Sequence, residues 1–269
     1  MNILLLGDIV GPSGRKAVVE KLPEIIKKKK IDFVIVNGEN AGDLGVGITK
    51  NNFDAFLKAG ADVVTSGNHI WDEKETMKFI AVEERLLRPQ NLIKESPGKG
   101  YGIFYAKNKK RVAVINLMGN VFMKKSEDVF QEAKKFIEEV KLKKQADFIV
   151  VDMHGEITSE KMAMGYLFDG KATMIVGTHT HVPTSDYRIM EKGTAYQTDV
   201  GMCGDYASVI GMNRDNSLKK FLKDPTAIKH HPALGEATIS GLFVTADIKT
   251  GLAKKVEPIV VGKHLENRI

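Results

Sequence analysis

The chain has 269 residues, of which 43% are hydrophobic and 28% are charged. This length and balance fit one soluble domain with a substantial core, and no unbroken apolar stretch is long enough to span a bilayer. The net charge is +6, but aromatic residues make up only 7% and do not interleave with the lysine runs, which argues against base-stacking platforms for nucleic acid. A single cysteine, Cys203, excludes an internal disulfide, and the first residues lack the pattern of a secretory signal, so we expect a cytoplasmic protein.

Short apolar runs alternate with amphipathic segments along the chain, which is the pattern of a βαβ architecture. We expect buried strands over residues 2–6, 32–36, 62–65, 146–152 and 174–176. We expect helices over residues 12–26, 49–60, 127–144 and 159–168, with further helical sequence from about residue 73. Hairpins are expected over residues 101–117 and 188–197, a glycine-rich loop over 198–212, and a closing antiparallel pair over 238–261. The chain has no repeat or clear linker, so residues 1–269 are expected to form a single domain.

Five of the apolar runs end in polar side chains that can bind a metal ion. These side chains are Asp8, Glu39, Asn40, Asn68, His154, His179 and His181. Open α/β sheets place their ligands at the carboxyl ends of strands, where we expect these residues to gather. Taken singly, each of these residues could instead have a structural role, as a helix cap, a turn residue or a core histidine. Their repeated position at strand ends argues against those readings.

Carboxylate, amide and imidazole groups without a thiolate suit iron, manganese or zinc. Seven ligands are too many for one tetrahedral ion and fit two ions that share a bridging carboxylate. Two such ions activate a hydroxide and clamp a phosphoryl group during in-line displacement. His69, beside Asn68, is positioned to protonate the leaving oxygen. Glu156 is a candidate to orient His154 or contact a water, and Trp71 and Asp72 are candidates to line the site.

These motifs resemble those of the calcineurin-like metallophosphoesterases. The matching segments are Gly-Asn-His at 67–69, the lone His154 and Gly-Thr-His-Thr-His at 177–181. The sequence departs from that pattern at Val10, where a histidine is expected, and at Ile70, which follows the Gly-Asn-His triplet.

A third departure is Gly-Glu-Asn at 38–40 in place of Gly-Asp. The departures are similar to the bacterial YmdB-type branch, in which a glutamate bridges the metals and an asparagine replaces the missing histidine. Segments 198–202 and 209–212 also look typical of that branch.

The resemblance implies a four-layer αββα sandwich, in which two mixed sheets are flanked by helices. It implies two divalent or trivalent metal ions, with iron favoured and manganese or zinc as alternatives. One ion would lie on Asp8, Glu39, Asn40 and His181, and the other on Glu39, Asn68, His154 and His179. His69 would protonate the leaving oxygen after in-line attack by a hydroxide that bridges the metals. The substrates implied are 2′,3′-cyclic nucleotides.

Three other functions are weighed against a phosphodiesterase. A phosphomonoesterase would use the same pair of metals. A metal-containing regulatory protein would contact RNA through its lysine-rich surface, although the complete ligand set argues for catalysis. A Rossmann-like nucleotide-binding module lacks the glycine fingerprint after the first strand. The sequence leaves homo-oligomer formation, the physiological substrate and the native metal open.

Overall fold

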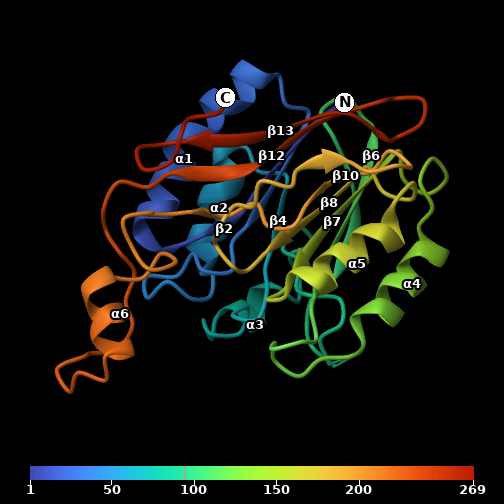
Figure 1. The fold of residues 1–269 in the computed structure, drawn as a ribbon. Helices are drawn as coiled ribbons and strands as arrows, with labels where there is room; N and C mark the ends of the chain where they lie inside the picture. Colours follow the sequence, from blue (N-terminus) through green and yellow to red (C-terminus); the bar gives the residue numbers. More distant parts are fainter. Residues whose placement is uncertain (94) are drawn as a thin grey trace.

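Two mixed β-sheets lie face to face between two layers of helices (Figure 1). The structure is a computed structural model that describes residues 1–93 and 95–269. The first sheet has the order β13-β12-β1-β3-β4, with strands Ala253–Val261, Ile239–Ala246, Asn2–Leu6, Phe33–Asn37 and Val63–Thr65. The second has the order β5-β6-β7-β8-β10-β9, with strands Tyr101–Tyr105, Arg111–Met118, Phe148–His154, Met174–Thr178, Ala195–Gln197 and Arg188–Ile189.

The alternation of side chains along the central strands creates the layers. In β1, Ile3 and Leu5 enter the core between the two sheets, whereas Leu4 and Leu6 face the helices that cover the first sheet. The same period of two divides β6, in which Val112 and Val114 enter the core between the sheets, whereas Ala113 and Ile115 enter the core on the outer face of the second sheet. Strands that are buried on both faces read as continuous apolar runs, which is why the sequence revealed them.

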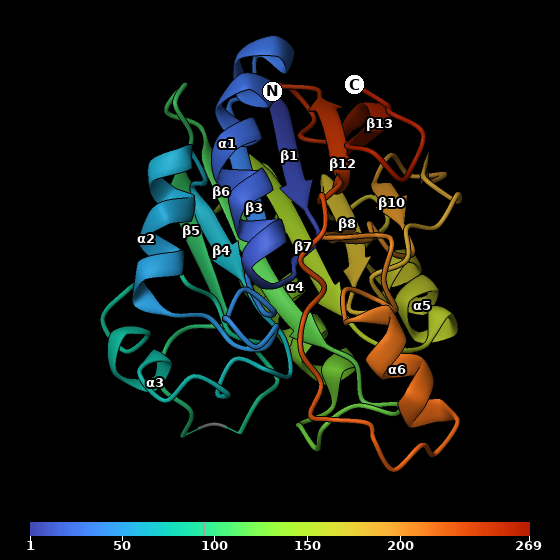
Figure 2. The same ribbon diagram turned by 90° about the vertical axis from the view of Figure 1, so that its left-hand side faces the viewer.

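Helices cover the outer face of each sheet. Helices α1 (Gly11–Lys29) and α2 (Lys50–Ala59) pack on the first sheet, and α4 (Val129–Glu139) and α5 (Thr158–Phe168) pack on the second (Figures 1 and 2). The predicted ends of α2 are confirmed, because the Thr49 side chain accepts from the Asn52 amide at 3.2 Å and Gly60 closes the helix with a φ of 111°. The four-layer αββα sandwich expected from the sequence is therefore confirmed.

Several predicted boundaries were wrong. The helix expected over 127–144 ends at Glu139, because Val140 takes an extended conformation and is buried against the second sheet. The helical sequence expected from about residue 73 yields only the single turn α3 (Thr76–Phe79). The loop over 198–212 contains a short strand, β11 (Met202–Cys203), that pairs in parallel with β2 (Asp8–Ile9).

Helix α6 (Arg214–Phe221) was not predicted. It stands away from the layered body (Figure 1), and its Leu218 and Phe221 side chains are exposed. The hairpins β5-β6 and β9-β10 and the closing pair β12-β13 are antiparallel, as predicted. Among the described residues, no helix combines the length and the apolar character needed to cross a membrane.

Candidate active site

The candidate ligands converge because the strands that deliver them are parallel within each sheet. Strands β1, β3 and β4 run in parallel, and so do β6, β7 and β8. The first set delivers Asp8, Glu39, Asn40 and Asn68, and the second set delivers His154, His179 and His181. All seven predicted ligands therefore lie at, or within three residues after, the carboxyl ends of β1, β3, β4, β7 and β8.

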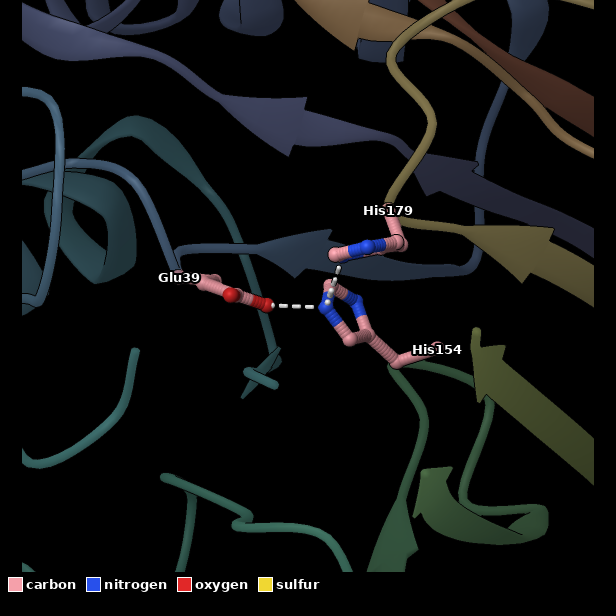
Figure 3. Close-up of side chains that lie close together, drawn as sticks. All are labelled: Glu39, His154 and His179. Carbon is pink, nitrogen blue, oxygen red and sulfur yellow. Dashed lines mark hydrogen bonds and ion pairs between the residues drawn. The ribbon is translucent and has the colours of Figure 1, made fainter. Parts of the chain in front are cut away.

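Glu39, His154 and His179 form the centre of this site (Figure 3). One ligand atom from each residue lies within 4.8 Å of the other two. The Nε2 atom of His154 is 2.6 Å from Glu39 Oε2 and 3.0 Å from His179 Nδ1. The two imidazole rings meet edge to face, with centroids 4.7 Å apart. This geometry groups one carboxylate and two imidazoles as a site that can hold a metal ion.

The other predicted ligands border this centre. Asn68 Oδ1 is 3.1 Å from His154 Nε2, and Asp8 Oδ1 is 3.7 Å from His154 Nδ1. Asn40 Oδ1 lies 3.2 Å from His181 Nε2. The structure thus brings Asn68 and Asp8 to the central cluster and pairs Asn40 with His181 beside it.

Burial controls the protonation of these groups. Loss of solvent raises the pKa of the Asp8 carboxyl and raises the pKa of Glu39 to about 7. Burial lowers the pKa of His154 to about 3 and that of His179 to about 2. Near neutral pH both imidazoles are therefore uncharged, which is the form that binds metals. A cation would compensate the buried carboxylates.

Two further observations fit a metal ion at this position. Within the described part of the chain, the buried oxygens Asp8 Oδ1 and Glu39 Oε2 have no hydrogen-bond partner. A Cβ atom at Gly67 would come within 1.7 Å of Glu39 Oε2 and 2.3 Å of His154 Nε2. Only glycine fits at position 67, because its backbone lies in direct contact with the side chains of the cluster. The donor set and the space both suit a divalent ion.

The turn after β8 is held in an unusual conformation. His179 and His181 have φ values of 97° and 66°, in the left-handed region of backbone conformation that residues other than glycine rarely adopt. The His179 amide donates to Asp8 Oδ2 at 3.0 Å, and the Thr180 amide donates to Asp199 Oδ2 at 3.1 Å. These bonds hold both histidines toward the site, and strain of this kind is concentrated at functional sites.

His69 lies on the wall of the open cavity next to the cluster. The cavity has a volume of about 290 Å³, and Glu39, Asn40, His179 and His181 also line it. The His69 amide donates to Glu39 Oε1 at 3.1 Å, and its Nδ1 is 2.6 Å from Asp72 Oδ2. Asp72 therefore orients the His69 ring, although it does not itself line this cavity. Trp71 instead packs, partly buried, against the core beneath α1 and α2.

Three contacts differ from the sequence interpretation or were missed by it. Glu156 contacts His179 Nε2 at 3.1 Å and not His154, because the turn after β8 brings His179 across to it. The Ile210 carbonyl lies 2.7 Å from His181 Nδ1, a backbone contact that no sequence pattern reveals. Lys124 Nζ donates to the Asn68 carbonyl at 2.6 Å and adds positive charge near the site. No sequence pattern distinguished Lys124 from the many other lysines of the chain.

Two facing mixed sheets flanked by helices, with buried carboxylates and imidazoles at the carboxyl ends of their strands, define a metallophosphoesterase-like fold. Within that class, the chain belongs to the YmdB-like protein family, whose sequence model matches residues 4–259. The resemblance drawn from the sequence is confirmed.

Individual relatives agree with this assignment over nearly the whole chain. The chain is 44% identical over 263 residues to the 2′,3′-cyclic-nucleotide 2′-phosphodiesterase of Bacillus subtilis (strain 168), with 97% of each chain covered. A crystal structure of a hypothetical protein from Thermus thermophilus matches with a TM-score of 0.89 at 36% identity, covering 98% of this chain and 100% of that one. A novel phosphatase from Mycoplasma pneumoniae matches with a TM-score of 0.90 at 35% identity, covering 97% and 93%.

Proposed function

We propose that the protein is a metal-dependent phosphodiesterase that hydrolyses 2′,3′-cyclic nucleotides. The observation that carries the proposal is the buried cluster of Glu39, His154 and His179, which opens onto the cavity beside His69. The name of the Bacillus subtilis relative supports the substrate class. Strain in a five-membered cyclic phosphate makes it an easy target for hydrolysis.

Two ions would share the Glu39 carboxylate. One would be held by Asp8, Glu39, Asn40 and His181, and the other by Glu39, Asn68, His154 and His179. The oxygen and nitrogen ligands support iron, manganese or zinc. Cys203 is excluded as a nucleophile, because burial raises the pKa of its thiol to about 12.

When bound, such ions polarise the phosphoryl oxygens and lower the pKa of water, so that hydroxide is available near neutral pH for in-line displacement. The contribution of the chain is to deliver a proton. Because Asp72 occupies Nδ1 of His69, the Nε2 atom is left to donate toward the cavity. Cleavage of the bond to the 2′ oxygen leaves a nucleoside 3′-phosphate, and His69 supplies the proton of the new 2′ hydroxyl.

Hydrolysis assays with a diester and a monoester test this function. Metal-free protein is supplied with manganese or iron and assayed on bis-p-nitrophenyl phosphate, p-nitrophenyl phosphate and 2′,3′-cyclic AMP. Glu39→Gln removes the shared carboxylate, so we expect it to lower diester hydrolysis at least about a hundredfold. Glu20→Gln makes the same chemical change at an exposed position of α1 and serves as the matched control.

The alternatives give different results in the same assay. Preference for the monoester would make the protein a phosphomonoesterase with the same site. Protein that is folded but inactive with every metal, and that binds RNA in a salt-dependent way, would support a regulatory RNA-binding role instead.

A further inference from the structure

A further buried carboxylate lies beneath the candidate site. Asp152, in the middle of β7, is fully buried, yet it is not among the predicted ligands. It accepts hydrogen bonds from Thr65 Oγ1 at 2.5 Å, Thr178 Oγ1 at 2.7 Å and Asn37 Nδ2 at 3.0 Å. Thr178 belongs to the second sheet, whereas Thr65 and Asn37 belong to the first. Asp152 therefore connects the two sheets directly below the metal ligands.

The hydroxyl of Thr178 links this carboxylate to His154. Its oxygen is 2.7 Å from Asp152 Oδ1 and 3.0 Å from His154 Nδ1. A hydroxyl has a single proton, and the Asp152 carboxyl group, which accepts from Thr65 and Asn37 at Oδ2, accepts the Thr178 proton at Oδ1. The proton of Thr178 therefore points to Asp152, and its oxygen is left to accept a proton from His154 Nδ1–H.

This direction of hydrogen bonding determines which nitrogen of His154 is free. A neutral imidazole carries one proton, so a proton on Nδ1 leaves a lone pair on Nε2. Nε2 is the atom that faces Glu39, Asn68 and His179. We propose that Asp152 and Thr178 are positioning residues that hold His154 in the tautomer whose Nε2 can bind a metal ion. This inference rests on the proposed metal-binding role of His154.

The same carboxylate also supports the turn that carries Glu39. The Asn37 side chain donates to Asp152 through Nδ2 and accepts from the Glu39 amide through Oδ1, at 3.0 Å in both cases. One buried group thus anchors a ligand from each sheet. A purely structural role does not require a carboxylate here, because well-packed apolar residues often stabilise a core as well as buried charges do. A role in orienting the proposed metal ligands Glu39 and His154 explains why this core position carries a carboxylate and its polar partners.

Zinc binding by three variants tests the proposal. Thr178→Val removes the hydroxyl, Thr178→Ser retains it, and Thr65→Val removes a comparable hydroxyl bond to Asp152 on the side away from His154. Zinc is titrated into metal-free protein in competition with a coloured chelator. We expect Thr178→Val to weaken zinc binding by about ten- to a hundredfold, as loss of an outer-shell partner typically does. Thr178→Ser should bind zinc as the wild type does, and Thr65→Val should weaken zinc binding much less than Thr178→Val, because the Thr178 hydroxyl remains in place to accept from His154.

Nuclear magnetic resonance of the zinc-loaded protein reads the hydrogen bond itself. The Nδ1–H proton of His154 should resonate downfield in the wild type and in Thr178→Ser, and move upfield in Thr178→Val. The wild-type spectrum alone reports the tautomer if Thr178→Val does not fold.

The possible outcomes separate this inference from the proposed function. Equal zinc affinity in the wild type and folded Thr178→Val, or a wild-type Nδ1 of His154 without a hydrogen-bonded proton, would overturn the positioning role while leaving the hydrolase intact. A weakening of equal size in Thr65→Val would also overturn it, since that result reflects general loss of structure. If the wild type binds none of zinc, manganese and iron, both proposals are overturned.

Discussion

His69 is the residue of the cavity whose role is easiest to separate from metal binding. Its ring is oriented by Asp72, and only its backbone amide contacts the Glu39 carboxylate. A side chain that protonates the leaving group accelerates the reaction more when that group is a poorer leaving group as an anion. The effect of removing His69 should therefore depend on the substrate.

We expect His69→Asn to slow hydrolysis of 2′,3′-cyclic AMP by about 10²–10⁴-fold, the usual contribution of general acid catalysis. Hydrolysis of bis-p-nitrophenyl phosphate should fall much less, because p-nitrophenolate leaves without a proton. Steady-state kcat on both substrates measures the ratio, and metal content should match that of the wild type. An equal loss on both substrates would assign His69 to metal or substrate binding instead.

At the scale of elements, the turn between β8 and β9 depends on a buried ion pair. Lys161 of α5 and Asp199 are each about 1% exposed, with Nζ and Oδ2 separated by 2.7 Å. Asp199 also accepts from the Thr180 amide, between the two histidines of the turn. At Gly177 a Cβ atom would lie 2.7 Å from the Lys161 stem, so glycine leaves room for that side chain to reach Asp199.

Lys161→Met should destabilise the protein by about 3–5 kcal/mol, because it leaves the Asp199 charge buried without a partner. The free energy of unfolding is measured in urea on the metal-free protein. Adding Asp199→Asn to this variant removes the uncompensated charge, so the double variant should recover part of the loss. A change below about 1 kcal/mol in Lys161→Met would show that water reaches and solvates the carboxylate.

The limits of sequence interpretation follow from how each element is stabilised. The central strands were predictable, and so was the position of the candidate ligands at their ends, because buried parallel strands leave apolar runs that stop where the candidate site begins. The strand Met202–Cys203 could not be found, since its pairing with Asp8–Ile9 depends on chain almost two hundred residues away. Helix α6 carried no burial pattern, because its apolar side chains are exposed. Asp152 was hidden inside an apolar run, although a charged residue there is itself a signal of a buried network.

At the scale of the whole molecule, the site joins two sheets that share one core. Glu39 comes from the first sheet and His154 from the second, and the sheets pack through residues such as Leu5 and Val150. The two sheets should therefore unfold together, and a bound metal should stabilise both. This agrees with the single domain expected from the sequence, which remains a prediction.

Thermal unfolding tests both expectations. Far-ultraviolet circular dichroism follows all elements, while fluorescence of the single tryptophan, Trp71, reports from the first sheet's helical side. The two transitions should coincide. Manganese at about a hundred times its Kd should raise Tm by about 5–10 °C in the wild type, and much less in Glu39→Gln. Two separate transitions would show that the chain contains independently unfolding units and would contradict the prediction of a single domain.

The order of the first sheet has a consequence for synthesis of the protein on the ribosome. Strand β1 lies between β3 and β12, and Asn2 pairs with Thr245. The edge of β1 that faces β12 therefore has no partner until residues 239–246 have emerged. An apolar strand with an open edge is a template for aggregation. The first strand of the nascent chain therefore stays exposed to aggregation until almost the whole chain has been synthesised.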